Sequence, residues 1–126
     1  MIDHLSLVVR DFARARAFYA AALAPLGYVV LREFSVASVG RDIVGFGVPP
    51  KPDFWIAAGD DPTSPLHIAF RAESRSDVDA FHAAALSAGG GDNGPPGLRP
   101  HYHPDYYGAF VIDPAGHNIE AVHHGD

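Results

Sequence analysis

Three side chains of this sequence have the chemistry of a metal-binding site: His4, His67 and Glu120. Each lies in a short run of apolar and β-branched residues, which is typical of a β-strand. Because side chains alternate between the two faces of a strand, each of the three belongs to a mixed face, while the opposite face is wholly apolar. We expect the apolar faces to pack on helices, so that the mixed faces line one shared concavity.

Two imidazoles and one carboxylate form a facial triad, which holds a divalent metal and leaves coordination positions open for water or substrate. Such a site suits Fe(II), Mn(II), Zn(II) or Ni(II), and spacing does not choose among these metals. The alternative is that the three residues are unrelated polar side chains at strand edges. An internal repeat favours the metal site over this alternative.

The sequence repeats itself at an offset of 63 residues, half of its length of 126. The run AFYAAAL at 17–23 returns as AFHAAAL at 80–86, and the same offset relates His4 to His67. Two copies are too few for a solenoid, so we expect one pseudo-twofold domain. The domain covers 1–126, with module one at 1–60 and module two at 64–126.

Each copy has the element order β-α-β-β-β, which predicts an α+β fold. Apolar spacing places the elements as strands at 2–9, 28–34, 43–48 and 53–58 with a helix at 12–24, then strands at 66–71, 107–112 and 118–123 with a helix at 77–88. Asp11 and Ser76 are the expected helix N-caps. The segment 89–105, rich in Gly and Pro, is expected to be a weak strand or a loop over the site.

Composition excludes several classes of protein. The chain has no cysteine, which excludes disulfides, thiol nucleophiles and zinc–cysteine sites. Its net charge is −6 and Lys51 is its single lysine, so we expect no nucleic-acid partner. Apolar stretches are too short to span a membrane, and the N-terminal residues have no basic signal region, so we expect a cytoplasmic protein without a membrane partner.

The segments 2–28, 65–70 and 113–122 resemble the vicinal oxygen chelate superfamily of glyoxalases, extradiol dioxygenases, fosfomycin-resistance transferases and bleomycin-resistance proteins. The resemblance implies that two βαβββ modules pair into an open, cup-shaped eight-stranded sheet around one divalent metal. His4, His67 and Glu120 fall on the ligand positions of this family. Many members are homodimers in which module one of one chain pairs with module two of its partner, whereas others pair the modules within one chain. The short linker 59–66 can favour swapping.

One departure from the family concerns a fourth ligand. Glyoxalase I takes a further carboxylate from the last strand of its first module. The offset of 63 places Ala57 at the position equivalent to Glu120, and an alanine methyl cannot bind a metal. The resemblance therefore favours branches with three protein ligands over a strict glyoxalase I.

Acid–base groups and substrate contacts are expected around the metal. His101 and His103 lie in a segment that could cover the mouth of the cup, and Tyr107 could hydrogen-bond a ligand oxygen. These three are the candidate catalytic residues. The candidate substrate-binding residues are Ser6, Trp55, Arg71 and Phe110. For each of these side chains, plain packing or solvation is the alternative.

Three functions follow from this resemblance. The first is a metalloenzyme that acts on a small vicinal-oxygen substrate, with lyase, isomerase, dioxygenase and transferase chemistry left open. The second is thiol transfer to an antibiotic of the fosfomycin type, which a chain with one lysine fits less well because a phosphonate needs a cationic pocket. The third is a non-catalytic protein that sequesters a small molecule, as bleomycin-resistance proteins do.

Overall fold

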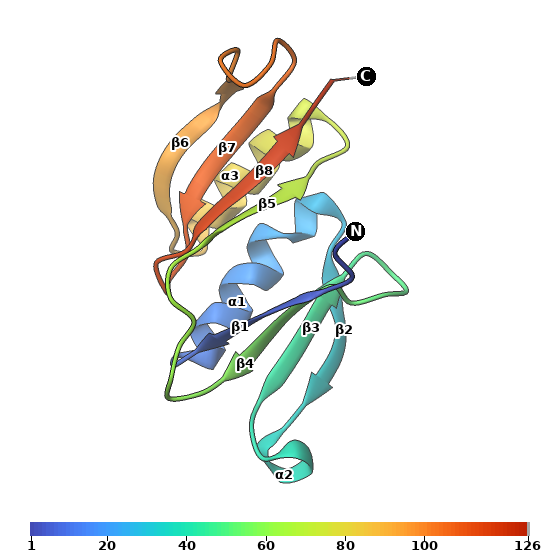
Figure 1. The fold of residues 1–126 in the computed structure, drawn as a ribbon, viewed down its shortest axis with the longest axis vertical. Helices are drawn as coiled ribbons and strands as arrows, with labels where there is room; N and C mark the ends of the chain where they lie inside the picture. The colour runs from blue at the N-terminus through green and yellow to red at the C-terminus, as the bar shows by residue number, and fades with distance from the viewer. Residues whose placement is uncertain (126) are drawn as a thin grey trace.

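The computed structural model describes residues 1–125, and Asp126, the last residue of the expected second module, lies outside the described residues. Two modules follow one another along the chain (Figure 1). The first contains β1 (Leu5–Val9), α1 (Phe12–Ala22), a 3-10 turn (Ala24–Leu26), β2 (Val29–Phe34), α2 (Val36–Val39), β3 (Ile43–Gly47) and β4 (Phe54–Ala58). The second contains β5 (His67–Arg71), α3 (Arg75–Ser87), β6 (Gly91–Leu98), β7 (Tyr107–Ile112) and β8 (Asn118–His123).

The two modules have the same strand order. The first sheet runs β1-β4-β3-β2 and the second runs β5-β8-β7-β6, with the first and last strand of each module parallel. This architecture confirms the predicted α+β fold of two βαβββ modules. The eight strands are divided between two open four-stranded sheets, which lie in the lower and upper halves of Figure 1.

The helix starts show one prediction confirmed and one wrong. The Asp11 side chain caps α1 by accepting a hydrogen bond from the Arg14 amide at 3.2 Å. The second helix begins at Arg75, and its cap is Ser74 rather than Ser76. Ser74 has the extended backbone of an N-cap, and its hydroxyl accepts from the Asp77 amide at 3.1 Å. Ser76 already lies in the first helical turn, so its hydroxyl has no such amide to cap.

The segment 89–105, expected to be a weak strand or a loop, contains the strand β6. β6 pairs with β7 in an antiparallel ladder whose register shifts between Asp92 and Gly94 and again between Gly94 and Gly97. Gly94 has a φ of 146°, which a side chain would strain, and the two prolines that follow it cannot donate to the ladder. The short helix α2 was not expected from the sequence.

The apolar strand faces form one core with α1 and α3, and this core is continuous between the modules. The Phe54 ring of β4 packs on the Phe70 ring of β5, with centroids 5.3 Å apart. Tyr19 of α1 is fully buried and donates its hydroxyl hydrogen bond to Asp113, in the turn between β7 and β8. The chain therefore packs its own two modules against each other through their apolar sides.

Within residues 1–125, no helix is long and apolar enough to cross a membrane. The cytoplasmic location expected from the N-terminal residues stays a prediction.

Candidate functional site

His67 and Glu120 meet on the mixed face of the second sheet. Their strands, β5 and β8, are parallel neighbours, and His67 Nε2 lies 2.8 Å from Glu120 Oε1. The Glu120 side chain is 1% exposed, whereas the His67 side chain is 51% exposed. A buried carboxylate thus contacts a solvent-accessible imidazole. These two groups are ligands that suit divalent transition metals.

Tyr106 is the second partner of this buried carboxylate. Its hydroxyl donates a hydrogen bond to Glu120 Oε2, so both carboxylate oxygens are engaged. Burial, followed by the hydrogen bond to Glu120, raises the pKa of the Tyr106 hydroxyl far above its ordinary value, so it stays protonated as a donor. Gly108 leaves room for this contact, because a Cβ there would lie 3.2 Å from both Glu120 Oε2 and a Tyr106 ring carbon.

Within one chain, His4 does not join the His67–Glu120 pair. Its Nδ1 is 2.7 Å from Asp3 Oδ1, and the residue helps to line a cavity of about 240 Å³ between the start of β1 and residues 68–71 of β5. His67, the first residue of β5, does not line this cavity. Among the described residues, no group of three or more His, Asp or Glu side chains is close enough to hold a metal. One chain therefore brings together two of the three expected ligands.

The loop histidines contact other rings in the described part of the chain. His101 packs on Tyr102, with ring centroids 4.2 Å apart. His103 Nε2 lies 2.8 Å from His124 Nδ1, and both of these rings flank Tyr106 at 5.4 and 5.3 Å. His103 thus approaches Glu120 through Tyr106, and His101 lies one ring further away.

Tyr107 faces the helix rather than the site. Its hydroxyl donates to Asp79 of α3 at 2.6 Å, and this hydrogen bond raises the pKa of Tyr107. Strand alternation could have indicated this orientation, since Tyr107 shares its parity with the buried Ala109 and Val111. Tyr106, the last loop residue before β7, is the tyrosine that reaches Glu120.

The substrate-binding candidates fall into three places. Phe110 lies beside His67, with ring centroids 6.1 Å apart. Ser6 and Trp55 are paired neighbours on the mixed face of the first sheet. Arg71 lines the 240 Å³ cavity with His4. The structure thus groups Phe110 with His67 and Glu120, and places the other three candidates apart from them.

Strand register changes the position equivalent to Glu120. Across β5, β8 and β7, the residues level with one another are Ala69, Glu120 and Phe110, which we call the module-two row. Across β1, β4 and β3 the matching level holds Ser6, Trp55 and Gly45, the module-one row. Ser6 and Ala69 are separated by the repeat offset, so Trp55, rather than Ala57, is the spatial counterpart of Glu120. Neither Trp55 nor Ala57 has a side chain that can bind a metal.

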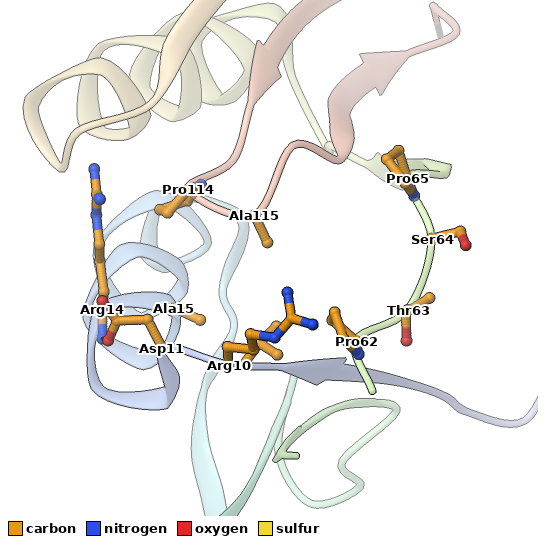
Figure 2. Close-up of a pocket in the computed structure, with 11 residues that line it drawn as sticks. Arg10, Asp11, Arg14, Ala15, Pro62, Thr63, Ser64, Pro65, Pro114 and Ala115 are labelled. Carbon is orange, nitrogen blue, oxygen red and sulfur yellow. The ribbon is translucent and has the colours of Figure 1, made fainter. Parts of the chain in front are cut away.

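A further cavity, of about 430 Å³, lies at the end of β1 (Figure 2). Its walls come from the start of α1, the linker and the β7–β8 turn, and the Arg10 side chain points between Pro62 and Ala115. None of the candidate site residues lines it. The cavity is therefore separate from the His67–Glu120 pair.

Comparison with known proteins agrees with this geometry. The family model of the glyoxalase/bleomycin resistance protein/dioxygenase superfamily matches residues 1–121. No curated protein matches the sequence significantly. A glyoxalase/bleomycin resistance protein from Albidiferax ferrireducens T118 is similar in structure, with a TM-score of 0.75, 29% identity and 98% of each chain covered.

Two other solved structures share the fold at lower identity. Glyoxalase I from Zea mays has a TM-score of 0.73 and 20% identity over 99% of this chain and 45% of its own. A mutant of the fosfomycin resistance protein FosX from Listeria monocytogenes, in complex with Mn(II) and 1S,2S-dihydroxypropylphosphonic acid, has a TM-score of 0.68 and 18% identity, over 97% of this chain and 88% of its own. The family match covers nearly the whole chain, so the protein belongs to the glyoxalase/bleomycin resistance protein/dioxygenase superfamily.

Proposed function

We propose that this protein is a divalent-metal-dependent enzyme that acts on a small molecule with two neighbouring oxygen atoms. The contact between His67 Nε2 and Glu120 Oε1 at 2.8 Å carries this proposal. An imidazole nitrogen and a carboxylate oxygen are ligands that suit Fe(II), Mn(II), Zn(II) or Ni(II). When bound, the metal supplies Lewis-acid stabilisation of negative charge that develops on a substrate oxygen.

The third ligand of the proposed site is His4 of a second copy. Among the described residues of one chain, His4 forms no metal-sized group with His67 and Glu120, and the apolar core already joins the two modules. A homodimer that places module one of one copy against module two of the other would add an imidazole to each His67–Glu120 pair. Such closed, symmetric dimers are the commonest oligomers of soluble proteins.

The surrounding residues and one similar structure support a number of protein ligands and a class of substrate. Trp55 and Ala57 carry no ligand on the last strand of module one, which supports a site with three protein ligands. Phe110 supplies an apolar wall beside His67. The FosX complex holds Mn(II) with a vicinal dihydroxy phosphonate, which supports an oxygen-rich small molecule as the substrate class.

Metal analysis of protein purified without chelator tests this proposal. We expect stoichiometric metal in the wild type and its loss in His67→Ala and Glu120→Gln. Both variants should fold, which circular dichroism checks. A wild type without affinity for any of the four metals would refute the proposal.

Mixing His4→Ala with Glu120→Ala tests the shared site. Each variant alone should bind no metal. Random pairing should restore about one site in four, because half of the dimers are mixed and each mixed dimer has one complete site. No recovery after mixing would show that His4 does not complete the site of another copy.

Sequestration of a small molecule without catalysis is the second candidate. The stacked rings of Phe34 and Trp55, with centroids 6.4 Å apart and planes at 20°, favour it. Phe34 is 42% exposed, so the pair offers an apolar surface on the mixed face of the first sheet. Binding of an aromatic ligand by metal-free protein, lost in Trp55→Ala, would support this function over the enzyme.

A further inference from the structure

The Glu120 carboxylate has a different partner on each oxygen: His67 on Oε1 and Tyr106 on Oε2. We propose that Tyr106 is the positioning residue of the site, and that its hydroxyl holds Oε2 so that Glu120 presents Oε1 alone beside His67. This inference rests on the proposed metal site and adds a residue to it. It also assigns the loop before β7 a definite role at that site.

Three neighbouring rings hold the Tyr106 side chain. Tyr102 packs against it at 4.8 Å between centroids, and His103 and His124 contact it at 5.4 and 5.3 Å. The contact of 2.8 Å between His103 Nε2 and His124 Nδ1 joins the loop to the segment after β8. His103 and His124 therefore act through Tyr106, by holding the ring whose hydroxyl bonds Glu120.

The backbone of β7 is matched to this contact. Gly108 follows Tyr106 by two residues, and a Cβ at this position would lie 3.2 Å from Glu120 Oε2 and 3.2 Å from a Tyr106 ring carbon. Such distances are tighter than ordinary van der Waals contact, so a side chain here would push the hydroxyl and the carboxylate apart. Glycine thus permits the approach of Tyr106 to Glu120.

The hydrogen bond has a consequence for metal binding. A carboxylate can bind a metal through one oxygen or through both. With Oε2 occupied by Tyr106, Glu120 would bind a metal through Oε1 only. One more coordination position would then be free, which suits a substrate that binds through two oxygens.

Co²⁺ titration of the full-length wild type, Tyr106→Phe and Tyr107→Phe tests this inference. We expect Tyr106→Phe to lose roughly tenfold in Co²⁺ affinity, as is typical when a partner of a metal ligand is removed. Its visible Co²⁺ absorption should also weaken, because binding through both oxygens raises the coordination number. Tyr107→Phe is the matched control and should keep both properties, since its hydroxyl bonds Asp79 of α3.

The possible outcomes separate this inference from the proposed function. A wild type that binds Co²⁺ while Tyr106→Phe keeps the wild-type affinity and spectrum overturns the role of Tyr106 alone. A wild type that takes up no Co²⁺ overturns the metal site and this role together. If Tyr106→Phe does not fold, Gly108→Ala decides, because it keeps the hydroxyl but displaces it. The same weakened spectrum in Gly108→Ala supports the role, and an unchanged spectrum overturns it.

Discussion

The module-one row and the module-two row occupy the same level of two sheets with the same strand order, but their side chains differ in kind. Module two has the buried carboxylate of Glu120 beside Phe110, whereas module one has the indole of Trp55 over Gly45. In module one the larger side chain, Trp55, is on the last strand β4 and the smaller residue is on β3. In module two the larger side chain, Phe110, is on β7 and the smaller one, Glu120, is on the last strand β8. The repeated backbone therefore supports two surfaces, one with metal-binding chemistry and one aromatic.

This difference shows how a duplicated module can specialise. The apolar faces of both modules are constrained by the shared core, because a change of volume there leaves a cavity or a clash. Glu120 and Trp55 lie outside this apolar core, so a carboxylate and an indole are compatible with the same backbone. The kind of side chain in a row therefore differs between the two modules, although the strand order is the same.

The largest expected contrast is between Glu120→Ala and Trp55→Ala, which truncate matching positions of the two rows. Loss of a protein ligand should lower metal affinity by at least roughly 100-fold for Glu120→Ala. Trp55→Ala should keep the wild-type metal content, because an indole is not a metal ligand. Calorimetric titration of both variants measures the contrast. Equal losses would contradict the assignment of Glu120, and not Trp55, as the metal ligand of the two matching positions.

A second contrast concerns Tyr19 and His82, which are related by the repeat offset. Tyr19→Phe leaves a buried Asp113 oxygen without its donor, and this should lower the free energy of unfolding by roughly 3 kcal/mol. His82 contacts the half-exposed Asp92 at 3.0 Å, so His82→Gln should cost under about 0.5 kcal/mol. Urea unfolding measures both changes. A similar cost for the two would contradict the expectation that the buried Tyr19–Asp113 hydrogen bond stabilises the fold more than the partly exposed His82–Asp92 contact.

A third contrast compares Gly45, in the module-one row, with Gly108, where a Cβ would approach Glu120 of the module-two row. A Cβ on Gly45 would lie 2.7 Å from the Trp55 ring, whereas one on Gly108 would lie no closer than 3.2 Å to its neighbours. We expect Gly45→Ala to lower the free energy of unfolding by roughly 2 kcal/mol and Gly108→Ala by roughly 1 kcal/mol or less. Trp55 is the single tryptophan, so its fluorescence should change in Gly45→Ala and stay constant in Gly108→Ala. The reverse pattern would refute the register of the rows.

The smallest effect is expected in alkaline solution. Tyr28 donates to Asp53 in module one, and Tyr106 donates to Glu120 in module two. Burial and these carboxylates raise both hydroxyl pKa values above the ordinary value of 10.0. These two hydrogen bonds therefore stabilise the folded state fully below about pH 10. Their contribution is lost as the pH rises toward the raised pKa values, because in that range these two hydroxyls ionise in the unfolded chain but not in the folded one. Ultraviolet titration of native and unfolded protein should show tyrosinate forming later in the native state. Coincident curves would argue against both hydrogen bonds.

Much of the fold was predictable from local pattern. The strands at 107–112 and 118–123 have the bounds that alternation and turn residues predicted, and the Asp11 cap is confirmed. The N-cap of α3 was predicted wrongly, because Ser74 and Ser76 are both suitable N-cap residues and only the backbone conformation shows which of them precedes the helix. At the site, the shared face of His67 and Glu120 followed from parity. The contact of Tyr106 with Glu120 did not, since it depends on the path of a loop.

The sequence by itself determined most of the strands, the two long helices and the face of the candidate ligands, because hydrophobic periodicity is a local property of the chain. Tertiary structure decided which of these residues meet. Strand register made Trp55 rather than Ala57 the counterpart of Glu120, and module packing left His4, among the described residues, out of any metal-sized group with His67 and Glu120. Both depend on contacts between distant segments: a shift of two residues keeps every side chain on its face and changes only its neighbours.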